Sequence, residues 1–361
     1  MKRKTNIAKQ IEEREFVESK TKQIFLPTGS TQLNLAMTDK ANGGYHLGKM
    51  VNLIGDSSSG KTFLAFTAFA EANRLKYFTN HRFIKDDPEA ADEFDIPKLF
   101  GQRTADRIEA PMQDEDGNDV YSSTIEDFLY HVKKALQDER PFIYVLDSLD
   151  ALTSEADEKK IEAEMKAHEK GTKTAGTYGM EKAKLIGRIL RTIVRELKKT
   201  NSILIIISQT RDNIEPMAMT KKTRSGGKAL KFFATHEIWL ANAGKVNKDV
   251  KGTKFKLGDN VLAKVAKNKI TGKHRQAQFV IYYDYGVDDI ASCIDFMVDN
   301  NFWTKKKLTI SIPELELEGT REKLIKEIEE NGLARKVSKL VEEAWLEMEE
   351  KVKLNRKAKY D

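Results

Sequence analysis

The sequence predicts an α/β fold with a mostly parallel central sheet. An apolar run at residues 49–54 leads into a glycine-containing turn, GDSSSGKT at residues 55–62, and a helical run at residues 63–70 follows. Further along the chain, helical stretches and apolar strand-like runs take turns, at residues 124–136, 141–147, 182–199 and 202–209. Strands that alternate with helices are typical of parallel sheets covered by helices. Consecutive strand-like runs then suggest an antiparallel extension of the sheet at one edge, at residues 236–240, 262–270 and 278–283.

The turn at residues 55–62 has the spacing Gly-x-x-x-x-Gly-Lys-Thr, which is typical of phosphate binding. A strand, a glycine turn and a helix N-terminus together aim backbone N–H groups at a polyphosphate. Lys61 would reach the β- and γ-phosphates, and the Thr62 hydroxyl would hold Mg²⁺. The alternative is an ordinary Gly/Ser turn, but the flanking elements favour a nucleoside triphosphate site. Its predicted residues are Gly55, Asp56, Ser57, Ser58, Ser59, Gly60, Lys61 and Thr62.

The apolar run at residues 141–147 ends in a carboxylate, Asp147. Downstream of a phosphate loop, an apolar strand that ends in an aspartate is the Walker B arrangement. Asp147 would then hold the Mg²⁺ that it shares with Thr62. The alternative is a solvated aspartate at a strand end. Asp147 and Thr62 are therefore the predicted metal ligands.

Composition excludes several classes of protein. The chain has 361 residues, of which 40% are hydrophobic and 33% charged, so we expect a folded protein with a sizeable core. No apolar run approaches the ~20 residues of a membrane helix, and the charged N-terminus lacks the apolar stretch of a signal peptide. We therefore expect a cytoplasmic protein with no membrane partner. A single cysteine, Cys293, excludes an internal disulfide and a multi-cysteine metal site.

The patterning divides the chain into three expected parts: an N-terminal helix at residues 1–23, a core at residues 24–288 and a small C-terminal helical domain at residues 289–361. The first part has only a thin apolar stripe, so it would pack on its own core or on a neighbouring copy. Within the core, residues 75–78 read as a second strand, and the glycine-interrupted residues 153–181 suggest a mobile surface segment. Three helix patterns fill the C-terminal part, at residues 290–300, 320–332 and 337–354.

A basic loop is expected at residues 209–231, after the strand at residues 202–209. Six lysines and arginines face one aspartate and one glutamate there, which gives a net charge of +4 (six minus two). The loop has no apolar periodicity, so packing does not explain it. Basic loops that project from a rigid sheet usually meet phosphates, although a merely solvated loop is the alternative.

Several segments together resemble RecA-type recombinases, including bacterial RecA and phage UvsX-like versions. They follow the family's order from about residue 24 to about residue 346. The shared pieces are PTGSTQLNLAM, GDSSSGKTFLAF, YVLDSLDAL, IISQTRDNI, SGGKALKFFATHEIWL, KVAKNKITGKHRQAQF and DYGVDDIASCIDFMVDNNF. SGGKALKFFA and KVAKNKI are the most specific, because phosphate-loop enzymes in general do not need them. The resemblance implies a RecA-like core, with the N-terminal helix as a possible polymerisation arm.

The resemblance also implies roles for residues around ATP. Gln209 would contact the γ-phosphate and report the state of ATP to a DNA-binding loop. Lys267 and Lys269, two residues apart on a strand and so on one face, would reach the γ-phosphate of ATP on the adjacent subunit. Without the resemblance, these would be two exposed strand lysines. Lys231 and Phe232 would lie at the same subunit interface.

Two loops would bind DNA if the resemblance holds. The first surrounds residues 171–182, and the second spans residues 210–227, where Arg211 would hold phosphate and Ile214 would wedge between bases. Lysines, including Lys173, stand in the first loop where the family has arginines. The predicted DNA-binding residues are Lys173, Tyr178, Gly179, Met180, Arg211, Ile214, Lys221, Lys222, Arg224, Ser225, Gly226, Gly227 and Lys228.

The sequence departs from the family at the strand that should present a catalytic glutamate. Residues 77–82 read YFTNHR, and carboxylates come only at Asp86, Asp87 and Glu89. Either His81 polarises the attacking water or one of the later acids loops back. The aromatic side chain that would stack on adenine also has no clear position, because Ala90 falls near it.

These features lead to three hypotheses. The first is an ATP-dependent, DNA-stimulated ATPase that forms helical filaments on single-stranded DNA, then pairs them with duplex DNA and promotes strand exchange. The second is a mediator or structural filament protein that binds ATP and DNA but hydrolyses ATP weakly or not at all. The third, a hexameric helicase or another motor of the same fold, leaves SGGKALKF and KVAKNKI unexplained.

Overall fold

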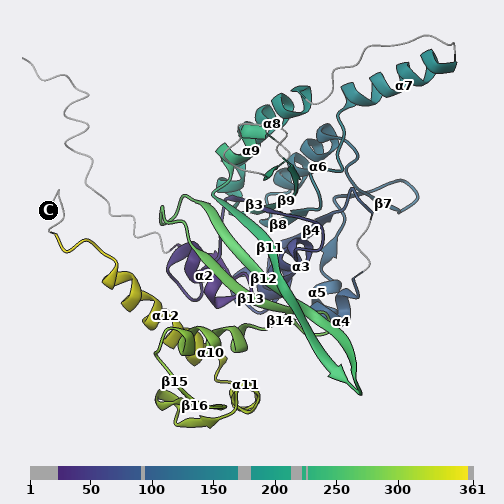
Figure 1. Ribbon diagram of the computed structural model, residues 1–361. Helices are drawn as coiled ribbons and strands as arrows, with labels where there is room; N and C mark the ends of the chain where they lie inside the picture. The colour runs from purple at the N-terminus through teal and green to yellow at the C-terminus, as the bar shows by residue number, and fades with distance from the viewer. Residues whose placement is uncertain (1–22, 91–93, 170–179, 213–221, 225–226, 357–361) are drawn as a thin grey trace, which may run out of the picture.

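A large, mostly parallel sheet organises the protein, and it confirms the predicted α/β class (Figure 1). The computed structural model describes residues 23–90, 94–169, 180–212, 222–224 and 227–356. Within them, the sheet has the order β14-β13-β12-β11-β3-β9-β8-β4-β5, with β10 paired to the end of β9. The strands from β11 to β5 run parallel, while β12, β13, β14 and β10 pair antiparallel.

The two longest strands of this sheet, β11 and β12, are neighbours, and the strands at both of its edges are short. Their bounds are β3 Met50–Gly55, β4 Arg82–Asp86, β5 Ile108–Glu109, β8 Phe142–Leu146, β9 Ile203–Asp212, β10 Lys222–Arg224, β11 His236–Val250, β12 Thr253–Asn268, β13 Gln276–Tyr282 and β14 Gly286–Val287. Two small antiparallel pairs lie outside it, β1 Phe25–Leu26 with β2 Tyr45–His46, and β6 Met112–Gln113 with β7 Asp119–Val120.

Helices cover both faces of the sheet and bury two apolar clusters. On one face, α3 packs Phe63, Phe66 and Phe69 against β3 and β9. On the other face, α6 and α8 bury Phe128, Ile189 and related side chains against β8 and β9. The helices of the core are α2 Thr31–Thr38, α3 Lys61–Asn73, α4 Ile96–Phe100, α5 Gln102–Ala105, α6 Ile125–Gln137, α7 Glu155–Glu169, α8 Met180–Thr200 and α9 Gly227–Phe233.

The strand expected at residues 75–78 is wrong. A 3-10 helix, η1 Lys76–Phe78, occupies that position, and the strand is β4, which pairs with β8 from Arg82↔Phe142 to Asp86↔Leu146. The guanidinium of Arg107 donates hydrogen bonds to the carbonyls of Phe78, Thr79 and His81, so these groups are satisfied without a strand partner. The strand therefore begins later than expected, and the acids Asp87 and Glu89 directly follow its C-terminal end.

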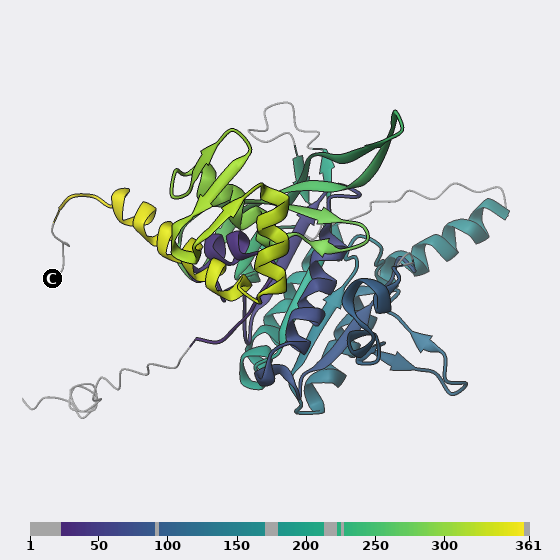
Figure 2. The same cartoon turned by 90° about the horizontal axis from the view of Figure 1, so that it is seen from below.

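Two parts of the molecule project from its body. The long β11–β12 ribbon extends beyond the sheet, and α7 extends away from the body in a different direction in both views (Figures 1 and 2). Within residues 153–181, where a mobile surface segment is expected, Glu155–Glu169 form the helix α7. Residues 170–179, which include Lys173, Tyr178 and Gly179, lie outside the described part of the chain.

The C-terminal part has its own apolar cluster, which includes Ile294, Trp303, Ile328 and Val341. The three expected helices are present: α10 Asp289–Asp299, α11 Arg321–Glu330 and α12 Ala334–Lys351. A small antiparallel sheet, β15 Thr304–Lys306, β16 Thr309–Ile312 and β17 Leu317–Gly319, with the 3-10 helix η2 Pro313–Leu315, was not expected. The three strands are too short to give a clear sequence pattern, and the helices bury Ile310 and Ile312 of the middle one.

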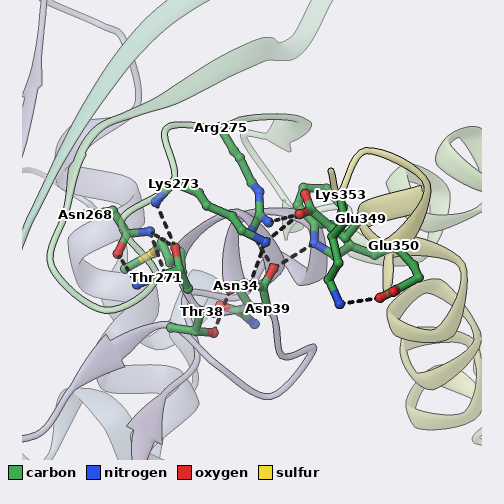
Figure 3. A network of polar contacts seen from close by, with 12 residues as sticks. Asn34, Thr38, Asp39, Asn268, Thr271, Lys273, Arg275, Glu349, Glu350 and Lys353 are labelled. Atoms are coloured by element: carbon green, nitrogen blue, oxygen red, sulfur yellow. Dashed lines mark hydrogen bonds and ion pairs between the residues drawn. The ribbon is translucent and has the colours of Figure 1, made fainter. Parts of the chain in front are cut away.

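A polar network joins α12 to the core at the turn between β12 and β13 (Figure 3). Arg275 pairs with Asp39 and with Glu349, at 2.5 Å from the latter, and its guanidinium lies 5.1 Å from the Trp345 ring. Lys273 adds an ion pair of 2.6 Å to Glu349. Because a buried guanidinium is costly unless it is paired, these contacts fix Arg275 between α2 and α12.

None of the helices in the described ranges is long and apolar enough to cross a membrane. Residues 1–22, where the N-terminal helix is predicted, lie outside those ranges.

Candidate functional site

The predicted phosphate loop lies between β3 and α3, at the C-terminal edge of the sheet. Gly60 precedes the helix with φ +87°, and Ser58 also has a positive φ of 57°. A Cβ atom at Gly60 would lie 2.9 Å from Ile281 Cδ1, so both its conformation and its surroundings require glycine. The loop turns tightly here and leads directly into the N-terminus of α3, a 13-residue helix.

Lys61 and Thr62 begin this helix and face the same pocket. The ammonium of Lys61 donates a 2.7 Å hydrogen bond back to the Asp56 carbonyl, and the side chain is buried. Burial lowers the pKa of Lys61, and the nearby carboxylates of Asp147 and Glu89 partly offset that shift. The Thr62 hydroxyl donates a hydrogen bond to Asp147, which directly follows β8.

The pocket in front of this loop has a volume of about 450 Å³. Its lining includes the predicted residues Ser58, Ser59, Gly60, Lys61, Thr62 and Asp147. Gly55, Asp56 and Ser57 complete the turn without lining the pocket. The adjacent hydroxyl and carboxylate oxygens of Thr62 and Asp147 are donors that Mg²⁺ prefers, so these residues fit that ion beside a polyphosphate.

Two acids that follow β4, Asp87 and Glu89, also line the pocket. Glu89 accepts hydrogen bonds from the Ser148 hydroxyl and, at 3.2 Å, from the side-chain amide of Gln209. Gln209 lies on β9, and its backbone N–H donates to Asp150 at 2.7 Å. Residues from the C-terminal parts of β4, β8 and β9 therefore meet at the Glu89 carboxylate. Of the two alternatives for the group that activates water, His81 or a later acid, the geometry supports the later acid.

His81 does not belong to this group. It precedes the N-terminal end of β4, whereas the pocket lies at the C-terminal end, one five-residue strand away. The imidazole is buried against Phe78, with ring centroids 4.7 Å apart. Burial lowers the pKa of His81 to about 4. The prediction that His81 polarises the attacking water is corrected on this geometry.

Two aromatic residues from distant segments also line the pocket. Phe94 comes from the segment before α4, and Tyr283 follows β13. They provide aromatic surface that the sequence interpretation could not locate near Ala90. Asp259, Val261 and Ile281 complete this wall. On strands, residues two apart share a face, which is the signal that could have grouped Asp259 with Val261 and Ile281 with Tyr283.

Lys267 and Lys269 lie at the end of β12 and converge, as predicted from their spacing. Their ammonium groups donate to the Phe232 carbonyl at 3.0 Å and 2.8 Å, and Lys267 also donates to the Lys231 carbonyl. Both acceptors end α9. Burial and the charge of Lys269 lower the pKa of Lys267 to about 8. Neither lysine lines this chain's own pocket, while the Lys231 side chain and the Phe232 ring, 68% exposed, face solvent.

The second predicted DNA segment is partly a strand pair and not only a loop. Arg211 extends β9, which pairs with β10 as Arg211↔Thr223, and the guanidinium lies 3.4 Å from Asp150. Lys222 and Arg224 are on β10. Gly227 and Lys228 begin α9, and Met180 begins α8. Other predicted residues lie outside the described ranges: Ile214, Lys221, Ser225 and Gly226.

Comparison with known proteins gives matches over most of the chain. A sequence model of the RecA N-terminal domain matches residues 10–288. Protein RecA of Thermus thermophilus is 30% identical over 305 residues, which cover 84% of this chain and 80% of the relative. Protein RecA of Bacteroides thetaiotaomicron is 31% identical over 270 residues, or 75% and 72% of the two chains. Protein RecA of Gloeobacter violaceus is 29% identical over 308 residues, or 85% and 74%.

Proposed function

This chain belongs to the RecA family, and from that premise we propose that it is an ATP-dependent DNA recombinase. It forms filaments on single-stranded DNA and promotes homologous pairing with duplex DNA and strand exchange. The observation that supports this proposal is the convergence of Lys61, Thr62, Asp147, Glu89 and Gln209 around one pocket. The work on DNA would take place in the cytoplasm of a bacterial cell or a phage-infected host.

In this proposal the pocket binds ATP with Mg²⁺. The loop at residues 55–62 would hold the phosphates through backbone N–H groups and Lys61, and Thr62 and Asp147 would hold the ion. Bound Mg²⁺ would neutralise developing charge on the phosphates. Tyr283 and Phe94 would provide apolar surface for the base.

Glu89 is the proposed general base for the attacking water. Its carboxylate lies on the pocket and is already within hydrogen-bond reach of Gln209, which would orient it toward the γ-phosphate. Because Gln209 continues into the β9–β10 extension, a change at the γ-phosphate would reach the DNA-binding segment through one strand. A carboxylate at this position also weakens the case for a filament protein that does not hydrolyse ATP.

Lys267 and Lys269 would complete the site of the adjacent subunit. They lie outside their own pocket and beside the exposed Phe232, so their ammonium groups are available to a neighbouring copy. Hydrolysis would then depend on filament assembly, and the basic residues Arg211, Lys222, Arg224 and Lys228 would hold the DNA backbone.

The test is steady-state ATP hydrolysis with and without single-stranded DNA, with electron microscopy of the same samples. DNA-stimulated turnover together with helical filaments is the expected result. Filaments without turnover would support the mediator or structural protein instead, and closed rings would contradict both.

A further inference from the structure

The last residue of β4, Asp86, places a carboxylate on the buried face of the sheet. Successive residues of a strand point to opposite faces, so Asp86 shares a face with Ile84, which belongs to the apolar cluster covered by α6 and α8. Its neighbour Asp87 points to the other face and lines the pocket, whereas Asp86 is fully buried and does not line it. A carboxylate among apolar side chains is costly unless its oxygens accept hydrogen bonds, so its bonding partners are informative.

Three hydrogen bonds satisfy the Asp86 carboxylate. The backbone N–H of Ser122 donates to Oδ1 at 2.8 Å, the Ser122 hydroxyl donates to Oδ2 at 2.6 Å, and the Tyr144 hydroxyl donates to Oδ2 at 2.5 Å. The Ser122 hydroxyl has only one hydrogen, which it gives to Asp86, so it accepts from Nδ1 of His131 at 3.0 Å. Tyr144 lies on β8, Ser122 precedes α6 and His131 lies on α6. The carboxylate therefore joins the end of β4 to β8 and to α6.

A second set of contacts joins the end of β4 to the residues that follow β8. The backbone N–H of Asp147 donates to the Asp86 carbonyl at 2.9 Å, just past the last pair of the two strands, Asp86↔Leu146. The hydroxyl of Ser148 then donates to Glu89. Asp86 thus contacts the proposed Mg²⁺ ligand through the backbone and lies three residues before the proposed general base.

The connection between Asp86 and Glu89 is short. Only Asp87 and Pro88 separate them, and the proline ring fixes one of the backbone dihedral angles between the two acids. A shift of the strand end would therefore move the Glu89 carboxylate. A general base must lie within hydrogen-bond reach of the proton that it takes, and a misplacement of about 1 Å can cost about a hundredfold in rate.

We propose that Asp86 is a positioning residue for ATP hydrolysis, because its bonds to Ser122 and Tyr144 fix the strand end that places Glu89 at the attacking water. The inference rests on the proposed role of Glu89 and adds the residues that hold it in place. Asp86, Ser122 and Tyr144 do not line the pocket, so they act only through the position of Glu89. A merely structural network would change the free energy of unfolding and leave the rate of the chemical step unchanged.

The first arm of the test compares two buried serines at opposite ends of β8. Ser122→Ala removes a hydroxyl that donates to Asp86, and the matched control Ser202→Ala removes one that accepts from the Phe142 N–H at 3.1 Å. Urea unfolding should show that both variants are less stable. Only Ser122→Ala should lower the single-turnover rate of ATP hydrolysis with single-stranded DNA, by about tenfold or more, while ATP affinity stays within a few fold. Equal rates in the two variants would overturn the proposal.

The second arm tests whether the network acts through Glu89. In a Glu89→Gln background the proton acceptor is already absent, so adding Ser122→Ala should change the residual single-turnover rate less than about twofold. A further tenfold loss, roughly what Ser122→Ala should cause alone, would overturn the positioning of Glu89. Tyr144→Phe keeps the ring and removes only the hydroxyl, so it replaces Ser122→Ala in both arms if that variant does not fold.

The same measurements separate this inference from the proposed function. If the unmodified protein does not hydrolyse ATP, the proposed ATPase itself is wrong. If Glu89→Gln alone keeps the full rate, the proposed general base is wrong, and its positioning by Asp86 is rejected with it. If Glu89→Gln loses activity and Ser122→Ala does not, the general base stands and only the positioning role is rejected.

Discussion

The two ends of the pocket are built in different ways. The proposed phosphate end comes from one short stretch, residues 58–62, and from Asp147 after β8, a strand that β9 separates from β3. The base end collects Phe94, Asp259 and Tyr283 from segments separated by up to 189 positions (283 minus 94). One end therefore depends on local backbone geometry, and the other on the register of an antiparallel sheet edge. In the proposed ATP site, phosphate binding and base binding would therefore depend on separate parts of the fold.

Lys61→Ala should have the largest effect on ATP binding at the phosphate end. Removing the buried ammonium deletes a charge-assisted contact to phosphate, so ATP affinity should fall about a hundredfold or more and turnover should vanish. Isothermal titration with ATP measures this. Lys98→Ala, an exposed lysine outside the pocket lining, is the matched control and should bind ATP normally. Normal ATP binding by Lys61→Ala would contradict the phosphate assignment.

Glu89→Gln should separate chemistry from binding at the same end. The amide keeps the shape and its hydrogen bond to Ser148, but it cannot take a proton, so turnover should fall by about 10²- to 10⁴-fold while ATP affinity stays within a few fold. Single-turnover hydrolysis with DNA present measures it. Asp87→Asn is the matched control, since Asp87 lines the pocket but pairs with Lys85 at 3.2 Å. A larger loss in Asp87→Asn would move the base to Asp87.

The double variant Lys267→Ala with Lys269→Ala tests whether these lysines of one subunit complete the pocket of the next subunit. ATP binding by the separate protein should be unchanged, because neither lysine lines its own pocket. DNA-stimulated hydrolysis should fall by about a hundredfold, since cations supplied in trans stabilise the charge that develops on phosphate. Unchanged stimulation by DNA would reject the assignment. Lys264→Ala, an exposed lysine on the same strand, should retain it.

Tyr283→Ala probes the base end and should have a smaller effect. Losing an aromatic platform costs roughly 1–3 kcal/mol, so ATP affinity should fall by about tenfold or somewhat more. Tyr283→Phe keeps the ring and loses only the hydroxyl bond to Asp259, so it should recover most of that affinity. Equal losses in the two variants would show that the hydroxyl, and not stacking, is what the base end requires.

Acid should lower the free energy of unfolding of the whole fold, which carries both ends of the pocket. Burial lowers the pKa of His236, which begins β11, to about 4. The unfolded chain binds a proton near pH 6.5 that the folded chain refuses, so stability is complete above that pH and falls as the pH drops toward 4. Between pH 8 and pH 6 this group should lower the free energy of unfolding by about 1 kcal/mol. Urea unfolding at both pH values, repeated on His236→Gln, should show a flatter dependence in the variant.

The phosphate end could be predicted from sequence because its geometry is local. GDSSSGKT and Asp147 were placed correctly beside each other, and the spacing of Lys267 and Lys269 gave their convergence. The strand β4 was misplaced because Arg82–Asp86 has only two apolar residues between charges, while residues 75–78 look more apolar. Without the correct position of this strand, the sequence does not single out Glu89 among the candidates for the group that activates water.

The base end could not be predicted for a different reason. Asp259 and Tyr283 meet only because β12 and β13 pair in one register, and a polar residue on a strand does not reveal what it faces. Phe94 precedes a five-residue helix in a stretch without clear periodicity. The small sheet in the C-terminal part escaped notice since its strands have three to four residues and are stabilised by the helices around them.

The network around Arg275 connects the turn between β12 and β13 to α2 and to α12 (Figure 3). The turn that follows Lys267 and Lys269 is pinned at one end by Asn268, which donates to the Met37 carbonyl at 2.9 Å, and at the other by Arg275 to Asp39 and Glu349. The turn thus cannot shift without either the C-terminal helix α12 or the end of α2 moving with it. A displacement of the C-terminal part would therefore be passed on to Lys267 and Lys269, the two lysines that we propose act on a neighbouring subunit.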